Sequence, residues 1–394
     1  MGRSQSDRNS GFVVATPGRS VCDDNARALE QAGTLRFLAL ATRRGTAGIP
    51  PEHTRLNPVI GLCAYAGART LPAFEAESFR FRLHPWFDLW VKRQLVPGNS
   101  VISSYGYANA CFAWARRHGG KTFLDGGNSH PENFWAILSE EHRRWNCSDP
   151  PVARHHFRRS VAMMEHVDYV LSPSLFVTQS FLERGFKPEQ ILRNVYPLDL
   201  SCFTPGTEKR PVERPLTLIS TGSLSLRKGT PYLLEAFRLL RREIPEAKLL
   251  LTRAVQDSAR PALEKYADLP IEWAPSLPHR QLAERLRSAD IFVLPSLEDG
   301  FARTVAEALA CGLPVVTTRN TGASDLIEPG TNGEIVPIRD PQAISTAILK
   351  WSGRAVSGEP RRSLLPKPEQ LSFEYFKKMF LEQLARLGLV QMQP

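Results

Sequence analysis

The sequence predicts an α/β protein built from two Rossmann-like, doubly wound domains. Short apolar strands alternate with helical segments over residues 216–350, and the first 200 residues repeat this alternation more loosely. The chain has 394 residues, which exceeds the limit of about 250–300 residues at which a single hydrophobic core stops growing. Its 42% hydrophobic and 23% charged residues are ordinary for a globular protein. Two domains of one class are therefore expected.

Residues 1–202 are predicted to form the N-terminal domain. Its strands are expected at residues 12–15, 35–42, 101–105, 121–124, 167–172 and 191–196, and its helices at 23–31, 108–117 and 174–184. The first strand runs into a loop where Gly18 would permit close approach of a ligand to the backbone. No GxGxxG pattern follows, so binding of a nicotinamide dinucleotide is poorly supported. Arg19 could reach a phosphate or be an ordinary surface arginine.

Residues 203–215 are predicted to be a linker, and residues 216–370 to be the C-terminal domain. The strands of this domain are expected at 216–221, 248–252, 271–274, 291–294 and 314–318, with helices from about 231 and 303. Residues 371–394 include an amphipathic helix with Phe373, Phe376 and Phe380 on one side.

Two cations follow the first strand of the C-terminal domain, directly before a helix. Arg227, Lys228 and Gly229 precede the helix that begins near Pro231. Cations at a helix N-terminus oppose the helix dipole, whereas an anion shared by the cations and the free N–H groups would explain them. The loop is therefore a candidate phosphate site, and two solvated cations are the alternative.

Two carboxylates flank the start of the next such helix. Asp299 lies in the loop after the strand 291–294, and Glu307 lies eight positions later, about one turn inside the helix. At the carboxyl edge of a parallel sheet, Asp299 could face a ligand and Glu307 could accept hydrogen bonds from vicinal hydroxyls, as carboxylates do with a ribose. The alternative is that Asp299 only caps the helix and Glu307 is a solvated glutamate.

The segment PSLEDGFARTVAEALACGLPVVTTRNTGASDLIEPGTNGEIV resembles the C-terminal signature of retaining family-4 glycosyltransferases, which have the GT-B fold. In that signature two glutamates are separated by seven residues. Asp299 and Glu307 stand at these two positions, and the shorter Asp299 replaces the first glutamate. The other matching residues are Gly312, Pro314, Gly322, Asn332 and Gly333. The resemblance implies two domains that face each other across a cleft, with the C-terminal helix packed back on the N-terminal domain.

The resemblance also implies roles for individual residues. Lys228 matches the lysine that holds the donor diphosphate, whereas Ser223 stands where the family has an arginine, so that role is vacant or taken by Arg227. The catalytic residues are expected to be His130, Asp299 and Lys228, with Asp125 as a second choice to His130; capping of the following helix is the alternative for His130. Expected substrate-binding residues are Glu307, Arg227, Gly18, Gly222, Ser223, Gly300, Phe301, Ala302, Arg303 and Thr304.

The implied activity is metal-independent transfer of a sugar, with retention, from a nucleotide-diphosphate sugar to a hydroxyl of a glycan, a lipid-linked acceptor or a small molecule. A nucleotide-sugar 2-epimerase and a non-catalytic scaffold with this fold are the alternatives. No cofactor beyond the donor is expected. The six cysteines are scattered without CxxC spacing, and no DxD motif or other metal cluster is present.

The net charge of +10 is spread over the chain, so a nucleic-acid partner is not expected. The basic runs 142–144 and 154–159 are either solvated helix faces or contacts to an anionic membrane. No apolar run is long enough to span a membrane and no signal-peptide pattern is present, so a cytoplasmic location is expected, including the inner face of the membrane.

Overall fold

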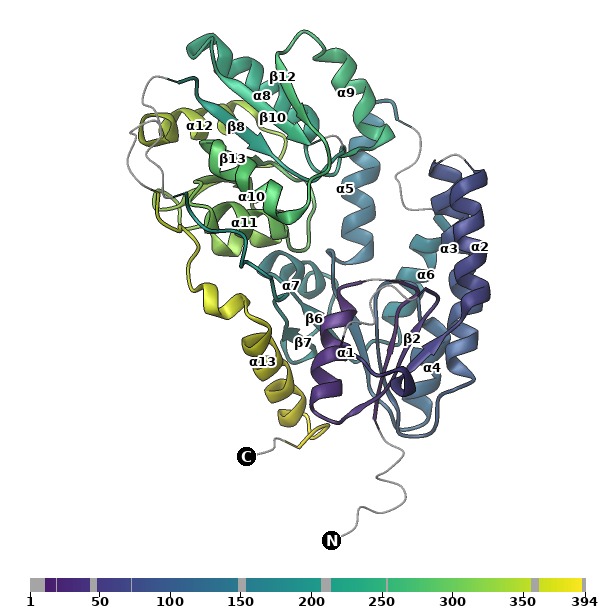
Figure 1. The fold of residues 1–394 in the computed structure, drawn as a ribbon. Coiled ribbons are helices and arrows are strands. Elements are labelled where there is room, and N and C mark those ends of the chain that lie inside the picture. Colours follow the sequence, from purple (N-terminus) through teal and green to yellow (C-terminus); the bar gives the residue numbers. More distant parts are fainter. Residues whose placement is uncertain are drawn as a thin grey trace.

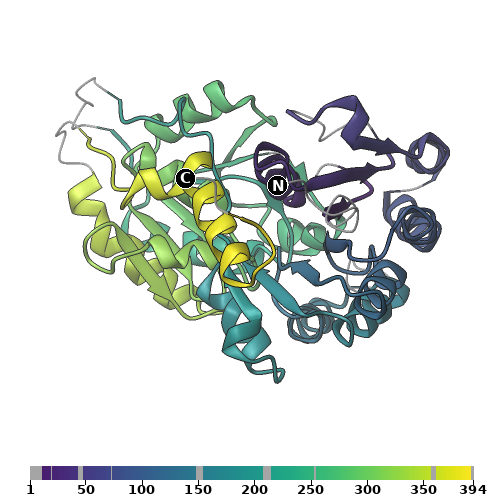
Figure 2. The same cartoon turned by 90° about the horizontal axis from the view of Figure 1, so that it is seen from below.

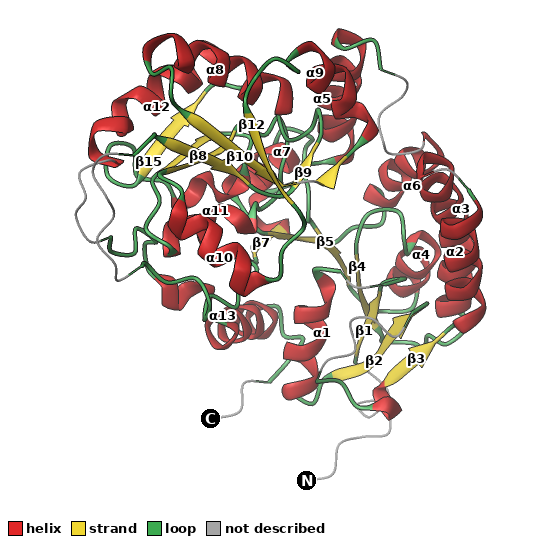
Figure 3. Ribbon diagram, turned by 45° about the horizontal axis from the view of Figure 1, so that its top comes forward, coloured by secondary structure: helices red, strands yellow, loops and turns green. Residues whose placement is uncertain are grey.

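A computed structural model describes residues 11–18, 20–42, 48–71, 73–147, 154–206, 214–252, 254–355 and 361–391. Arg19, the first ten residues and positions 207–213 of the expected linker lie outside these ranges. The described chain forms two domains, each with a parallel sheet (Figure 1). Helices cover both faces of each sheet (Figure 3), as a doubly wound α/β fold requires.

The N-terminal sheet has seven parallel strands in the order β3-β2-β1-β4-β5-β6-β7. The strands are β1 (Phe12–Ala15), β2 (Leu35–Leu40), β3 (Thr54–Leu56), β4 (Ser100–Ser103), β5 (Thr122–Asp125), β6 (Tyr169–Ser172) and β7 (Ile191–Arg193). The helices are α1 (Cys22–Gln31), α2 (Pro58–Thr70), α3 (Ala73–Lys92), α4 (Asn109–Arg117), α5 (Pro131–Arg144), α6 (Arg154–Met164) and α7 (Leu175–Leu182).

The C-terminal sheet has six parallel strands in the order β12-β10-β8-β13-β14-β15, and β9 pairs separately with β11. The strands are β8 (Thr217–Ser220), β9 (Ser223–Leu224), β10 (Lys248–Thr252), β11 (Ala254–Val255), β12 (Ile271–Ala274), β13 (Ile291–Leu294), β14 (Val315–Thr318) and β15 (Gly333–Val336). The helices are α8 (Thr230–Glu243), α9 (Arg260–Lys265), α10 (His279–Ser288), α11 (Arg303–Ala310), α12 (Pro341–Ala355) and α13 (Phe373–Arg386), with the 3₁₀ turn η4 (Gly322–Leu326).

The strand order determines which loops can share a ligand. From β8 the chain continues toward β10 and β12 on one side of the sheet, and from β13 it continues toward β14 and β15 on the other side. The loops that leave β8 and β13 therefore diverge and open a crevice between them. These loops carry residues 221–229 and 295–302. The fold therefore brings the two charged motifs of the sequence together at one sheet edge.

The two domains contact each other at several places besides the linker. Helix α5 extends from the N-terminal domain to the C-terminal domain (Figure 1), where buried Glu141 accepts hydrogen bonds from Tyr232 Oη at 2.7 Å and Arg339 Nε at 2.8 Å. Helix α13 lies against the N-terminal domain (Figure 2), and its Phe376, Phe380 and Leu384 belong to the same core cluster as β1 and α1.

Several elements differ from the sequence predictions. Residues 43–100, in which no element was predicted, contain β3 and the long helices α2 and α3. Helix α2 presents Val59, Leu62 and Tyr65 to solvent, so it lacks the polar outer face that marks a surface helix. Asp125 ends strand β5 instead of opening the following loop, and β7 ends at Arg193, three residues earlier than expected.

Candidate functional site

The loops after β8 and β13 are packed directly on one another. Leu297 N donates a hydrogen bond to Arg227 O at 2.9 Å. Gly229, which caps α8 with a φ of +70°, lies so close to Pro295 that a Cβ atom would be 1.9 Å from its carbonyl oxygen. Both the left-handed backbone and this contact require glycine. The Arg227-Lys228-Gly229 sequence therefore holds two cations beside the loop of residues 295–302, which carries Glu298 and Asp299 and is called the acidic loop.

Each cation pairs with its own carboxylate. Lys228 Nζ forms an ion pair with Asp299. Arg227 Nη1 donates to the backbone oxygen of Glu298 at 2.8 Å and to its carboxylate at 3.3 Å. Burial lowers the pKa of Lys228 more than Asp299 raises it. Burial raises the pKa of Asp299, but Lys228 and Arg227 outweigh this effect and the pKa is lowered overall.

Glu298 connects this loop to the N-terminal domain. Its fully buried carboxylate accepts a hydrogen bond from Ser129 N at 2.9 Å, and burial raises its pKa. Two glycines of the C-terminal domain also contact the N-terminal domain. A Cβ atom at Gly300 would lie 2.1 Å from Gly127 O, and one at Gly322 would lie 2.5 Å from Ser174 Oγ. The acidic loop is therefore part of the domain interface.

Glu307 lies in the second turn of α11 and carries a buried carboxylate oxygen, Oε2, with no hydrogen-bond partner within the described chain. Burial raises its pKa, and His279 and Arg303 act in the opposite direction. A buried carboxylate without a partner is costly. This geometry fits a side chain that accepts hydrogen bonds from a ligand, and it does not fit a solvated glutamate.

Comparison with known proteins places this site in a family. Residues 215–353 match the family model described as glycosyl transferases group 1. WcaL of Salmonella typhimurium, named as a colanic acid biosynthesis glycosyltransferase, is 30% identical over 177 residues, which is 43% of this chain and 43% of that protein. The match with the family model covers most of the C-terminal domain, which is therefore similar to group 1 glycosyltransferases.

A second relative is the GDP-mannose-dependent alpha-(1-6)-phosphatidylinositol monomannoside mannosyltransferase of Mycolicibacterium smegmatis. It is 27% identical over 253 residues, which is 59% of this chain and 62% of the relative. The chain thus spans about half the length of these two curated relatives. Both matches concern part of each protein.

Solved structures extend the likeness to both domains. Sucrose-phosphate synthase from Thermosynechococcus elongatus superposes with a TM-score of 0.63 over 96% of this chain and 99% of that one, at 17% identity. HepE of Anabaena, in complex with UDP, superposes with a TM-score of 0.62 over 95% and 99% of the two chains, at 13% identity. At such identities the likeness concerns the fold, which is the GT-B architecture predicted from the sequence.

The remaining predicted residues of the glycosyltransferase domain lie around this site. Gly222 has a φ of +104°, and half-buried Ser223 begins β9. Phe301 and Ala302 are buried ahead of α11, whereas Arg303 and Thr304 are half-buried in its first turn. Gly18, in the N-terminal domain, is half-buried beyond β1.

The structure places His130 in a capping position. Its Nδ1 accepts a hydrogen bond from Glu132 N at 3.3 Å at the start of α5, and its ring packs edge-on against Phe181 at 5.2 Å. Burial, with a smaller effect of Arg184, lowers the pKa of His130 to about 4, so the ring is neutral at pH 7. These contacts are those of the helix-capping alternative, and nothing in them tests a catalytic role.

Asp125, the second choice, is the buried centre of a structural network. Its two oxygens accept hydrogen bonds from Asn25 Nδ2 at 2.6 Å and Tyr196 Oη at 2.8 Å. Burial raises its pKa to about 7, although Tyr196, Cys22 and Asn25 act in the opposite direction. Both carboxylate oxygens have partners inside the protein, so Asp125 joins α1, β5 and the segment that follows β7.

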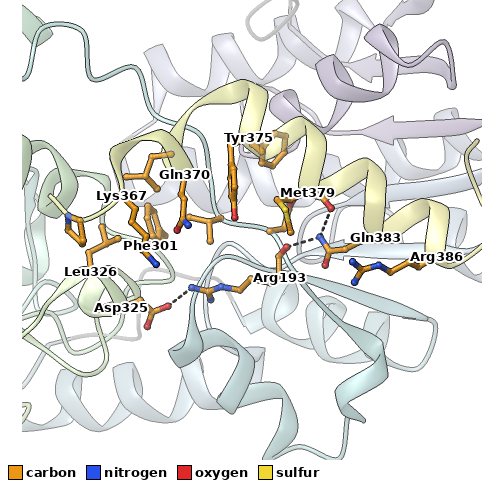
Figure 4. Close-up of a pocket in the computed structure, with 15 residues that line it drawn as sticks. Arg193, Phe301, Asp325, Leu326, Lys367, Gln370, Tyr375, Met379, Gln383 and Arg386 are labelled. Atoms are coloured by element: carbon orange, nitrogen blue, oxygen red, sulfur yellow. Dashed lines mark hydrogen bonds and ion pairs between the residues drawn. The ribbon is translucent and has the colours of Figure 1, made fainter. Parts of the chain in front are cut away.

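Phe301 does not point toward the two charged loops. Its ring lines a separate 440 Å³ pocket between the domains and α13 (Figure 4). Arg193 pairs there with Asp325, and Gln383 Nε2 donates to Arg193 O at 2.8 Å. The lining of this pocket includes neither Lys228 nor Glu307. The predicted substrate contact of Phe301 stays a prediction.

Sequence reasoning missed Glu298 and Ser129, which lie 169 positions apart and meet only through domain packing. A glutamate next to Asp299 gives no signal of its own. In the part of the chain that the structure describes, no group of three or more His, Cys, Asp or Glu side chains could hold a metal ion.

The contact at Gly300 gives the first prediction. Gly300→Ala should lower the free energy of unfolding by about 1–3 kcal/mol, because the new methyl group overlaps Gly127 O. Urea unfolding followed by fluorescence measures the change. Gly18→Ala is the matched control, since a Cβ there would meet only Thr42 Oγ1 at 3.7 Å. Equal stability of the two variants would show that the loops do not approach this closely.

Proposed function

We propose that the chain is a retaining glycosyltransferase of family 4 that transfers a hexose-type unit from a nucleotide-diphosphate sugar to a hydroxyl acceptor, without a metal ion. The observation that supports this most directly is the arrangement at the edge of β8 and β13. Lys228, in the loop before α8, pairs there with buried Asp299, which lies on the same loop–helix segment as Glu307. Glu307 Oε2 has no partner among the residues described. One cation, one sugar-facing carboxylate and one ribose acceptor are the groups that a nucleotide sugar needs.

Lys228 is assigned to the departing diphosphate. Charge builds on the phosphate oxygens as the glycosidic bond breaks, and a fixed cation in a buried site stabilises this charge more than water does. The backbone N–H groups between Gly300 and the start of α11 and the positive end of its dipole would contribute as well. This division of labour needs no divalent cation.

Ser223 stands where the family has an arginine, and Arg227 is poorly placed to take over the role of that arginine. Its Nη1 is committed to both the backbone and the carboxylate of Glu298. Moving it would leave a fully buried carboxylate without its cation. We therefore assign Arg227 to holding the acidic loop, and the diphosphate to Lys228.

Asp299 would position the donor sugar and Glu307 would bind the ribose. With His130 acting as a helix cap, no described residue is an evident nucleophile, so retention would follow from attack on the face that the diphosphate leaves. The relatives with printed activities are transferases, and no observation favours the epimerase or the scaffold. A GDP-dependent relative and a UDP complex both occur, so the base stays open.

The acceptor is proposed to be a glycan or a lipid-linked molecule, reached from the cytoplasmic face of a membrane. None of the helices in the described ranges is long and apolar enough to cross a bilayer. The basic runs named above are partly neutralised: Arg144 pairs with Glu140, and Arg159 with Asp88. They are therefore weaker candidates for membrane contact than their sequence indicates.

The outer face of α2 and α3 fits an anionic membrane better. It exposes Val59, Leu62 and Tyr65 on α2, and Trp86 and Leu89 on α3, where Trp86 is 68% exposed. Arg82 and Arg93 are exposed at helical spacing on either side of Trp86 and Leu89. An apolar face flanked by cations is typical of peripheral membrane contact.

Glu307 provides the first test of the proposed function. Glu307→Ala should weaken binding of UDP or GDP by about 1.5–3 kcal/mol, because a charged acceptor for the ribose is lost. The folded state should remain intact, since Oε2 makes no hydrogen bond within the described protein. Titration calorimetry measures the affinity, with Glu328→Ala, an exposed carboxylate of the same domain, as control. Unchanged affinity in Glu307→Ala would refute the ribose assignment.

Lys228 tests the catalytic site itself. Lys228→Ala should lower kcat/KM by about 10²-fold, close to 3 kcal/mol of transition-state stabilisation. Turnover is followed by mass spectrometry of a panel of UDP- and GDP-sugars, with excess EDTA in a parallel series to test the metal-free mechanism. Arg227→Ala is the comparison and should mainly reduce stability. A Lys228→Ala enzyme with normal turnover would place the phosphate site elsewhere.

Membrane contact is tested by sedimentation with vesicles of phosphatidylglycerol or phosphatidylcholine. Trp86→Ala and Arg82→Ala should each weaken binding to the anionic vesicles severalfold, whereas Arg158→Ala, in the basic run of α6, should not. A loss confined to Arg158→Ala would assign the contact to α6 instead. Equal binding to both lipids would exclude the charge contribution.

A further inference from the structure

A second pocket lies inside the N-terminal domain, between α3, α5, α6 and the loops that follow β4 and β5. Its volume is 350 Å³. Seven aromatic side chains from four segments line it, which are Phe81, Tyr105, Tyr107, Phe134, Trp135, His156 and Phe157. None of these residues was singled out by sequence motifs, because they are spread over almost 80 positions.

The rings form an ordered wall. His156 stacks on Phe81 with ring centroids 4.2 Å apart, and Trp135 stacks on Phe157 at 4.5 Å. His156 is 6% exposed, and its Nδ1 has no hydrogen-bond partner among the described residues. Burial, with smaller effects of His155 and the nearby arginines, lowers the pKa of His156 to about 3, so the ring is neutral. The wall is therefore apolar except for His156 Nδ1, which makes no hydrogen bond within the described chain.

The opposite end of the pocket is polar and adjoins the candidate site. It is formed by residues 127–129, with the hydroxyl of Ser104 nearby. Ser129 Oγ is buried without a partner in the described structure, while Ser129 N bonds Glu298. Gly127 and Asn128 lie against Gly300. A molecule in the pocket would therefore have its polar end at residues 127–129, which contact Glu298 and Gly300, the two neighbours of Asp299 in the chain.

The lining is uncharged. Among the described residues that line the pocket there is no Asp, Glu, Lys or Arg. A phosphate or carboxylate bound there would lose its hydration without gaining a cation, which is strongly unfavourable. The pocket thus differs from what a phosphorylated acceptor, such as the one named in a relative called D-inositol 3-phosphate glycosyltransferase, would require.

We propose that this pocket binds the acceptor, and that the acceptor presents an uncharged, hydroxyl-bearing group with an apolar body. The rings of Trp135, Phe157 and Phe81 would pack on the apolar body, and the hydroxyl would lie at Ser129, facing the donor. The acceptor oxygen then bonds to the anomeric carbon as the bond from that carbon to the diphosphate oxygen breaks. The hydroxyl proton passes to the departing diphosphate. This inference rests on the proposed glycosyltransferase function.

Direct binding to the full chain, without donor, tests the pocket. Titration calorimetry is run with 4-methylumbelliferone as an aromatic probe, octyl β-glucoside below its micelle concentration as an alkyl probe, and maltose and glucose 6-phosphate as hydrophilic probes. An apolar probe should bind, and the stronger of the two identifies the aromatic or the lipid source. Trp135→Ala should weaken it at least about tenfold, and Trp135→Phe should restore most of the affinity.

Trp273→Ala is the matched control, because Trp273 is an exposed residue of β12 in the C-terminal domain and lies outside the pocket. It should bind the apolar probe as the unaltered chain does. Stronger binding of maltose or glucose 6-phosphate, or equal affinity of Trp135→Ala and the unaltered chain, would overturn the inference. Binding of UDP and GDP is measured on the same variants and should not change. If the unaltered chain does not bind UDP or GDP, the proposed function is refuted. If it binds a nucleotide but no apolar probe, only the pocket assignment is refuted.

Discussion

The site depends on the burial of two adjacent carboxylates in one loop. Glu298 and Asp299 repel each other and are both removed from water, so neither could remain ionised without a cation. Arg227 and Lys228, adjacent in the neighbouring loop, provide one cation each. The pairing is possible only because Gly229 lets the loop after β8 approach Pro295. The sheet edge, Gly229 and the four charged side chains therefore form one constrained unit.

The same loop also fixes how the domains meet. Glu298 uses its second oxygen to accept from Ser129 N, and Gly300 leaves no space between itself and Gly127. Donor-side charges and the acceptor-side loop are thus in contact through backbone atoms. The Glu141 cluster with Tyr232 and Arg339 supports the interface at the end of α5. A change of domain orientation would have to break buried hydrogen bonds at both places, so it is coupled to the charge state of the acidic loop.

Local patterns of the sequence were sufficient for the C-terminal domain and insufficient for much of the other. Strands 248–252, 271–274 and 291–294 were predicted with the observed bounds. For 291–294 the reason is that a buried parallel strand is a continuous apolar run. His130 and Asp125 were chosen from the family resemblance, with capping as the alternative for His130, and the structure shows the local cap contact of His130 with Glu132 N. The contacts of Asp125 with Asn25 and Tyr196 join residues distant in sequence, so no local pattern indicates them. The Glu298–Ser129 contact and the aromatic pocket arise from residues distant in sequence, for which a single chain carries no signal.

The pairing of Lys228 with Asp299 has a consequence for the proposed reaction. In the structure Lys228, the cation assigned to the diphosphate, is neutralised by Asp299, the carboxylate assigned to the sugar. A diphosphate that takes Lys228 removes the partner of Asp299, which lies buried and must then accept hydrogen bonds from another donor. Sugar hydroxyls are such donors. Nucleotide and sugar would therefore be recognised together. The diphosphate takes Lys228 from Asp299, and the sugar hydroxyls replace the hydrogen bond that Asp299 then lacks. A nucleoside diphosphate without its sugar would leave Asp299 unsatisfied and should bind less tightly than the intact donor.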